Sequence, residues 1–407
     1  MNHPAHNRQP LWQMILHMLL PMLLLTITPA LLAAKPIRPA LDDTIVERLP
    51  KQHRVIAADL SMLPTLGNRN TPTNNSLRDT VNRTRHYLAL ARQYADPRMV
   101  GFAQSTLAPW LNTPTPDTEI LVLQALVKQA DHHFPEALQF LDIALAQQPG
   151  HVQALLTRAS ILQVIGNYPA ALRDCKQLVN RVATIISYTC IATTTGLSGQ
   201  LAKSLSVLQR YIDNTDNLSH EQFRWVISSM ADMAERLNNP ALAARYYQAA
   251  IAEKQADNYI NEAYAEFLLQ TRQYPQLLEF TQQTPPSDGL LVKRAFAEQQ
   301  LGDANVPATV KLLKQRFARA DARGDQKHLR EQAYFYLHVL KKPAKALTLA
   351  RQNWDHQREP MDTLLYFQAA LEQQDNNAIR TIKHWMKQSG FQDERLARLM
   401  LNQENRL

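Results

Sequence analysis

Apolar and small residues recur along this chain every 34 positions. Within each half of the repeat, large apolar residues are spaced by three and four, which is the spacing of an amphipathic helix. A fixed period of this length indicates a solenoid, in which each small helical unit packs on its neighbours. Three successive units carry the same pair of alanines twelve residues apart: Ala91 and Ala103, Ala125 and Ala137, and Ala159 and Ala171.

Turn-forming residues divide each unit into two halves. Two packed helices lie roughly 8–10 Å apart, and the near end of that range requires small side chains where the helices cross. The alanines therefore predict close helix–helix contacts inside and between the units. The breaks between the halves fall at Asp96-Pro97, at Asp131-His132-His133 and at Gly166-Asn167.

These units resemble the tetratricopeptide repeat, a helix–turn–helix motif of the same length. The family has large residues at positions 4 and 24, small ones at 8 and 20, and an aromatic residue at 17. The first unit departs from the family with Trp110 at a position where alanine is usual. The resemblance implies an all-α, right-handed superhelical solenoid of antiparallel helix pairs. The second unit fits best, with Leu121, Ala125, Phe134, Ala137, Leu141, Ala144 and Pro149.

The pattern predicts four segments along the chain. We expect a repeat array over residues 77–290, then divergent basic helical repeats and a C-terminal capping helix over 291–407. In that last part Ala295, followed by Gly302-Asp303, looks like half a unit. Residues 35–76 are rich in proline and polar residues and are expected to be a flexible linker.

Residues 1–34 have the order of a secretory signal peptide. Arg8 precedes the apolar stretch Met14–Leu25, and the small residues Ala30, Ala33 and Ala34 follow it. The alternative is an uncleaved anchor within residues 11–34, because an uncharged apolar segment of this length can span a bilayer. Both interpretations place the repeats outside the cytoplasm, in a bacterial periplasm or held at the inner membrane.

Positive charge is concentrated in the last third of the chain. Residues 35–290 have a net charge of zero, whereas residues 291–407 have a net charge of +7. A basic surface attracts anionic lipid, acidic partners or nucleic acid. Export argues against nucleic acid. The remaining interpretations are a solvated helix face or contact with an anionic membrane surface.

The two cysteines fall on helices that should be neighbours. Cys175 lies in the second helix of one unit and Cys190 in the first helix of the next. A periplasmic location permits a disulfide, which requires Cα atoms within about 7 Å of each other. A bridge is therefore one alternative, and two buried free thiols is the one that we favour.

The sequence predicts neither an enzyme nor a cofactor or metal site. His132-His133 and His151 have no carboxylate or cysteine at ligand spacing, and there is no phosphate-binding glycine loop. The carboxylate pairs Asp232 with Glu235 and Glu262 with Glu266 could do acid–base work. On repeat helices, however, such pairs more often face solvent or a partner.

In the tetratricopeptide family, positions 2, 5, 9 and 12 of each first helix line a concave groove. The early part of this predicted groove is apolar and amide-rich, and its later part is acidic with two aromatic residues. That gradient suits a peptide that is apolar at one end and basic at the other. For the two aromatic residues, Trp225 and Tyr259, the alternative is ordinary packing between repeats. The candidate residues are Val122, Leu126, Gln129, Leu156, Ser160, Gln163, Thr193, Trp225, Asp232, Glu235, Tyr259, Glu262 and Glu266.

We therefore expect a non-catalytic scaffold of the bacterial envelope that binds a protein or peptide partner. One alternative is a structural component of an export or surface-polymer secretion assembly, held near a membrane by its basic third. An enzyme that uses the solenoid as a frame is the weakest alternative, because no segment is left for a catalytic domain.

Overall fold

The computed structural model describes residues 76–111, 113–212, 218–253, 257–322, 324 and 327–404. Within these ranges every regular element is helical, with nineteen α-helices and one short π-helix. The signal peptide or anchor expected at 1–34, and the linker expected at 35–76 except for its last residue, lie outside the described residues. The described residues up to Asp321 and from Lys327 onward belong to one compact unit.

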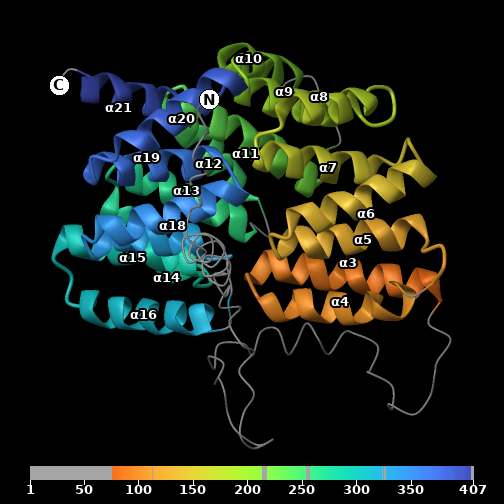
Figure 1. The fold of residues 1–407 in the computed structure, drawn as a ribbon, viewed down its shortest axis with the longest axis horizontal. Helices are drawn as coiled ribbons and strands as arrows, with labels where there is room; N and C mark the ends of the chain where they lie inside the picture. The colour runs from red at the N-terminus through yellow and green to blue at the C-terminus, as the bar shows by residue number, and fades with distance from the viewer. Residues whose placement is uncertain are drawn as a thin grey trace, which may run out of the picture. The chain divides into compact units, whose positions relative to one another are not determined.

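The helices follow one another as sequential pairs, as the repeat pattern predicts (Figure 1). The first helices of the pairs are α3 (Leu77–Tyr94), α5 (Thr118–Ala130), α7 (Val152–Val164), α9 (Thr184–Leu197), α11 (His220–Arg236), α13 (Asn258–Gln270), α15 (Asp288–Leu301), α17 (Leu329–Tyr334) with its π-helical extension η2 (Phe335–Val339), and α19 (Pro360–Glu372). Their partners are α4 (Pro97–Leu111), α6 (Phe134–Gln147), α8 (Tyr168–Gln177), α10 (Leu201–Ile212), α12 (Pro240–Ala252), α14 (Tyr274–Gln283), α16 (Val306–Ala322), α18 (Pro343–His356) and α20 (Asn376–Ser389). The single helix α21 (Glu394–Glu404) follows the last pair.

A residue with left-handed backbone angles ends the first helix of every pair. This conformation exposes the last carbonyls of the helix to new donors and turns the chain toward the second helix. Glycine adopts it freely, whereas other residues pay roughly 1–2 kcal/mol; here glycine supplies three of the nine positions. The nine residues are Ala95, His132, Gly166, Gly199, Asn238, Arg272, Gly302, Lys341 and Gln374.

Proline marks the start of most second helices. Its fixed φ suits the first helical turn, and its missing N–H removes a donor that would have no partner there. Proline occupies one of the first two positions in α4, α6, α8, α12, α14, α16 and α18. This placement explains how an all-helical array accommodates so many prolines.

The recurring alanines are core residues. Ala125, Ala137, Ala159 and Ala171 are 0% exposed, as is Ala103, and Ala91 packs at the edge of the first cluster. Small residues at these crossings let the helix axes approach closely, while larger side chains fill the space on either side. The repeat register therefore predicts the core of the first three units correctly.

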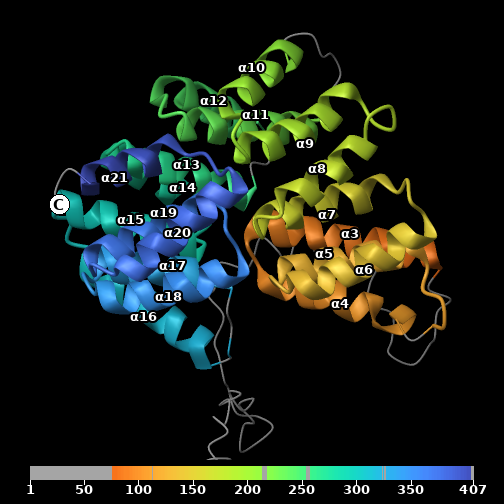
Figure 2. The same ribbon diagram turned by 45° about the horizontal axis from the view of Figure 1, so that its top comes forward.

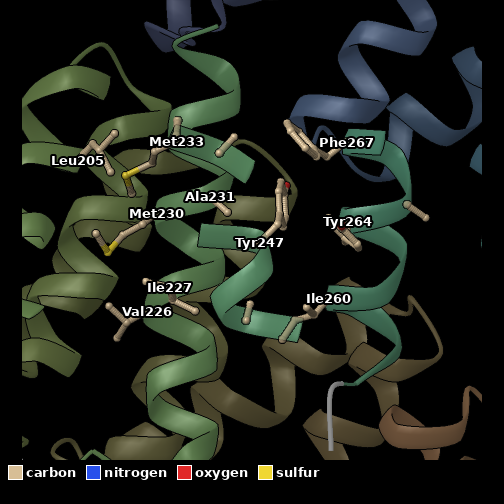
Figure 3. Close-up of a cluster of buried hydrophobic side chains, with 14 of the residues drawn as sticks. Leu205, Val226, Ile227, Met230, Ala231, Met233, Tyr247, Ile260, Tyr264 and Phe267 are labelled. Carbon is tan, nitrogen blue, oxygen red and sulfur yellow. The ribbon is translucent and has the colours of Figure 1, made fainter. Parts of the chain in front are cut away.

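The core continues without interruption through the middle of the array (Figure 3). Met233 on α11 points toward Leu205 on α10, and Met230 lies on the same side of α11. On the other side, the Tyr247 ring of α12 meets Phe267 of α13 at a centroid distance of 5.3 Å. Apolar packing therefore joins the α9–α10, α11–α12 and α13–α14 pairs.

The last helices pack back onto earlier repeats. The N–H of Arg358 donates to the carbonyl of Val164 over 2.7 Å, and the Trp385 ring of α20 packs on Tyr168 of α8 at 6.4 Å between centroids. Near the end of the chain, Gln392 accepts a hydrogen bond from the N–H of Leu201. The array therefore turns from α3–α8 through α9–α12 and back along α13–α21 (Figures 1 and 2), and its C-terminal pairs contact its earlier ones.

Cys175 and Cys190 form a disulfide in the structure. Their Cα atoms are 5.4 Å apart, and both side chains are buried between α8 and α9. The prediction that the two cysteines lie on neighbouring helices is confirmed. The prediction of two free thiols is wrong for this structure. The packing of the shorter helix α8 against the longer helix α9 brings the two sulfur atoms into bonding contact.

The segment after residue 290 is more regular than the sequence indicated. Ala295 lies in α15, and Leu313 and Phe317 of the following helix α16 pack in the same cluster as Ala295, so a second helix follows α15 where the sequence indicated half a unit. Residue 290 itself lies within α15. Helix pairs therefore continue through the basic third of the chain.

Candidate binding cavity

The first helices of the later pairs surround one cavity of about 820 Å³. Residues of α11, α13, α15, α17 with η2, α19 and α21 line it. On the central helices the lining side chains are spaced by three and then four residues, so one face of each helix is turned inward. These sets are Tyr259, Glu262 and Glu266 on α13; Gly289, Val292 and Phe296 on α15; Glu331, Tyr334 and His338 on α17 and η2; and Met361, Leu364 and Gln368 on α19.

The later half of the predicted groove converges on this cavity. Its five members are Asp232, Glu235, Tyr259, Glu262 and Glu266. Tyr259 is 66% exposed and therefore accessible to a macromolecule from outside. These five positions come from the groove pattern of the tetratricopeptide family. The structure places all five on the wall of the same cavity.

The earlier half of the predicted groove lies elsewhere. Val122 is 1% exposed and belongs to the core rather than to an open surface, because its side chain packs between adjacent pairs. Gln163 donates hydrogen bonds to the hydroxyls of Thr193 and Thr194, so it links α7 to α9. Trp225 packs between two core clusters, as in the alternative of ordinary inter-repeat packing. The half-buried Leu126, Gln129, Leu156 and Ser160 are likewise not among the residues that line the cavity.

A buried ion pair closes the α11 side of the cavity. Arg395 of α21 binds Glu235 and also Asp393, its Nη2 lying 2.6 Å from the Asp393 carboxylate. The Tyr247 hydroxyl donates to the other Glu235 oxygen over 2.8 Å. Burial raises the pKa of Glu235 to about 7, against the opposing effects of Arg395 and Tyr247. The C-terminal helix thus contacts α11 through this buried ion pair.

A second buried pair lies between α17 and α19. Arg330 donates from Nε to Asp362 over 2.5 Å and also binds Glu359. Asp362 is 1% exposed, and burial raises its pKa. Arg330 therefore neutralises carboxylates of its own segment, whereas Arg395 and Lys293 pair with Glu235 and Glu266 of earlier helices. Part of the excess positive charge of residues 291–407 thus meets internal carboxylates, which corrects the interpretation of that charge as an external surface alone.

Carboxylates also occupy the centre of the cavity wall. Glu266 lies 3.5 Å from the Nζ of Lys293. Glu262 accepts hydrogen bonds at Oε1 from Asn258 and Ser287. Glu331 lines the same wall, and its Oε2 is buried without a hydrogen-bond partner among the described residues.

Aromatic rings stand beside these carboxylates. The Tyr334 ring lies 4.3 Å from the His338 ring, and Phe296 packs edge-on against His338 at 6.0 Å. Burial lowers the pKa of His338, so the imidazole is neutral at physiological pH. The wall therefore combines apolar ring faces with unneutralised carboxylates, a composition suited to binding a cationic or amphipathic group.

Sequence reasoning missed the half of the cavity that comes from the last third. The missing residues include Lys293, Arg330, Glu331, Tyr334 and Arg395. The lining positions of α13 recur 30 residues later on α15, and those of α17 recur 30 residues later on α19. The residue types at these positions differ between the helices, so the sequence carried no signal for the recurrence, and a period of 34 does not align them.

Within the described residues, no group of three or more His, Cys, Asp or Glu side chains is arranged to hold a metal ion. None of the helices formed by the same residues is both long enough and apolar enough to cross a membrane. What the cavity offers chemically is recognition, through paired and unpaired charges, hydrogen-bonding groups and aromatic faces.

Comparison with known proteins returns structural neighbours only. No protein-family model matches the chain, and no curated protein matches it. A solved tetratricopeptide repeat protein from Parabacteroides merdae has 10% sequence identity and a TM-score of 0.37, over 72% of this chain and 98% of that one. Yeast Tom70 also has 10% identity, with a TM-score of 0.23, over 77% of this chain and 91% of that one.

Proposed function

We propose that this protein is a non-catalytic scaffold of the bacterial cell envelope, which binds a protein or peptide partner in the cavity formed by α11–α21. One observation carries the proposal: four inner helices turn faces of the same spacing toward one cavity of about 820 Å³, and residues of α11 and α21 complete its lining. That volume lies within the range of roughly 300–1,000 Å³ that is typical of ligand sites. A short segment of a partner chain fits such a space.

The disulfide supports the envelope location. Disulfides persist in secreted and periplasmic proteins and are rare in the cytosol. A buried Cys175–Cys190 bond is therefore consistent with a chain that folds after export. The signal peptide expected at residues 1–34 points in the same direction.

Site-specific photo-crosslinking in cells tests the binding proposal. Replacing Tyr259 by p-benzoylphenylalanine places a reactive group at an accessible position of the cavity wall. The matched control places it at Phe102, which is 44% exposed on α4 and outside the cavity lining. We expect one dominant crosslinked partner from position 259 and none from 102. Equal or absent crosslinking from both positions would exclude the cavity as the binding site.

A second candidate function is a structural role at a membrane surface. One observation favours it: on α16, exposed Lys311 and Lys314 flank Leu312, which is 40% exposed. Basic residues near an anionic bilayer contribute roughly 1 kcal/mol each. Flotation of the full chain with phosphatidylglycerol vesicles, compared with a Lys311→Glu/Lys314→Glu variant, tests it. Equal flotation of the two proteins would exclude α16 as the contact.

A further inference from the structure

The close approach of Gly289 to Glu262 shapes one end of the cavity. A Cβ atom at position 289 would lie 2.3 Å from Oε2 of Glu262, and 2.5 Å from its carboxyl carbon. Any other residue at 289 would therefore displace the carboxylate. Asn258 and Ser287 fix Oε1 of Glu262 by hydrogen bonds, which leaves Oε2 without a hydrogen-bond donor among the described residues.

Glu331 lies near this carboxylate without a counter-charge of its own. It forms no ion pair within the described residues, and its buried Oε2 has no hydrogen-bond partner. Burial and the negative charge of Glu262 both raise the pKa of Glu331, whereas Arg330 and His328 lower it. Leaving a buried acceptor unpaired is costly for a protein, so this arrangement is one that a ligand could complete.

Two cations of this part of the wall, Arg330 and Lys293, are already engaged. Arg330 binds Asp362 and Glu359. Lys293 binds Glu266 and donates to the carbonyl of Gly289. The wall between Glu262 and Glu331 is therefore short of positive charge.

Resting on the function proposed above, we propose that Glu262 and Glu331 receive one cationic side chain, a lysine or an arginine, of the partner segment that enters the cavity. Arginine can bind carboxylates through paired hydrogen bonds, and lysine can bind them as a point charge. The stem of either side chain would pack along the neighbouring Tyr334 ring, since such stems bury readily against apolar surface. A cationic partner segment is also what the acidic character of the later groove predicted.

Two properties of the variants Glu331→Gln and Glu262→Gln/Glu331→Gln test this proposal. Glu279→Gln serves as the matched control, because it removes one carboxylate from the exposed face of α14, the partner helix of α13. The first measurement is the yield of crosslinked partner from p-benzoylphenylalanine at position 259. We expect about a tenfold loss for the double variant, corresponding to one lost charged contact, and no change for Glu279→Gln.

The second measurement is the melting temperature of the purified, partner-free chain. Removing an uncompensated buried charge should raise it by about 2 °C in Glu331→Gln, with no change in Glu279→Gln. A protein that becomes more stable while it loses its partner identifies a carboxylate kept for binding. A lower melting temperature would mean that Glu331 has a structural role and would overturn the proposal.

The outcomes separate this inference from the proposed function. If the double variant captures the partner as well as the wild type does, the cavity binds but these carboxylates do not receive a cation. If the wild-type chain with the probe at 259 captures nothing, both proposals fail. Mass spectrometry of the captured segment gives a third criterion: a segment with no lysine or arginine beside the crosslink would also overturn the inference.

Discussion

Two opposing effects act on the ionised form of Glu235: burial destabilises it, and attraction to Arg395 stabilises it. The substitution Glu235→Gln shows which effect is larger. The Glu235 side chain is 11% exposed and that of Arg395 is 12% exposed. Gln keeps the size of the side chain and can still accept a hydrogen bond from Tyr247. The substitution therefore removes the ionisation of residue 235 with little change in packing.

The size and sign of the effect follow from the pKa of Glu235. Its ordinary value of 4.5 rises to about 7 in the folded protein. The folded state then binds the proton more tightly than the unfolded state does. The contribution of this group to stability is complete below about pH 4.5 and is lost as the pH rises through about 7. A shift of this size corresponds to about 3 kcal/mol, at 1.36 kcal/mol for each pKa unit.

Urea denaturation of the wild type and Glu235→Gln at about pH 5 and about pH 8 measures this effect. The difference between the two proteins cancels the titration of every other group. We expect the variant to gain roughly 2–3 kcal/mol relative to the wild type between the two pH values. If the variant instead loses stability relative to the wild type as the pH rises, attraction to Arg395 outweighs burial, and the reasoning is refuted.

Two further predictions concern how the pairs are joined. The disulfide closes a loop with a sequence separation of 15, so Cys175→Ala/Cys190→Ala should lower the free energy of unfolding by about 3 kcal/mol; thiol-reactive titration of the denatured, unreduced wild type should find no free thiol, and two would contradict the bond. Gly166 has φ +82°, and a Cβ there would lie 3.2 Å from Trp385, whereas Gly302 has φ +66° and open space around it. Gly302→Ala should cost about 1 kcal/mol through its backbone, and Gly166→Ala about 1–3 kcal/mol more through overpacking. Equal losses in chemical denaturation would argue against contact between the C-terminal pairs and α8.

The sequence predicted the parts of the fold that depend on local spacing. The alanines at 34-residue intervals predict helix crossings; five of the six are fully buried, and Ala91 is partly buried at the edge of its cluster. The backbone conformation of the turns is not predictable in the same way, because the exposed residues Arg272 and Gln374 adopt left-handed angles as Gly166 does. Residue type alone therefore does not mark this conformation.

The candidate site was half predictable. Tyr259 and Glu262 follow from the groove positions of the repeat, carried over to α13, but Glu331 and Arg395 do not, because the repeat length changes after α14. Closure of the array brings residues 160 positions apart together, as in the contact between Glu235 and Arg395. Charge counted along the chain could not show that basic residues of the last third turn inward to meet acidic ones.

Hydrogen exchange of the chain with and without its crosslink-identified partner tests the central claim most directly. Amides that a partner covers exchange more slowly. If the partner binds in the cavity, protection should appear in α13, α15 and α17, with α4 and α6 unchanged. Protection confined to α3–α8, with α13–α19 exchanging as in the free protein, would contradict the account.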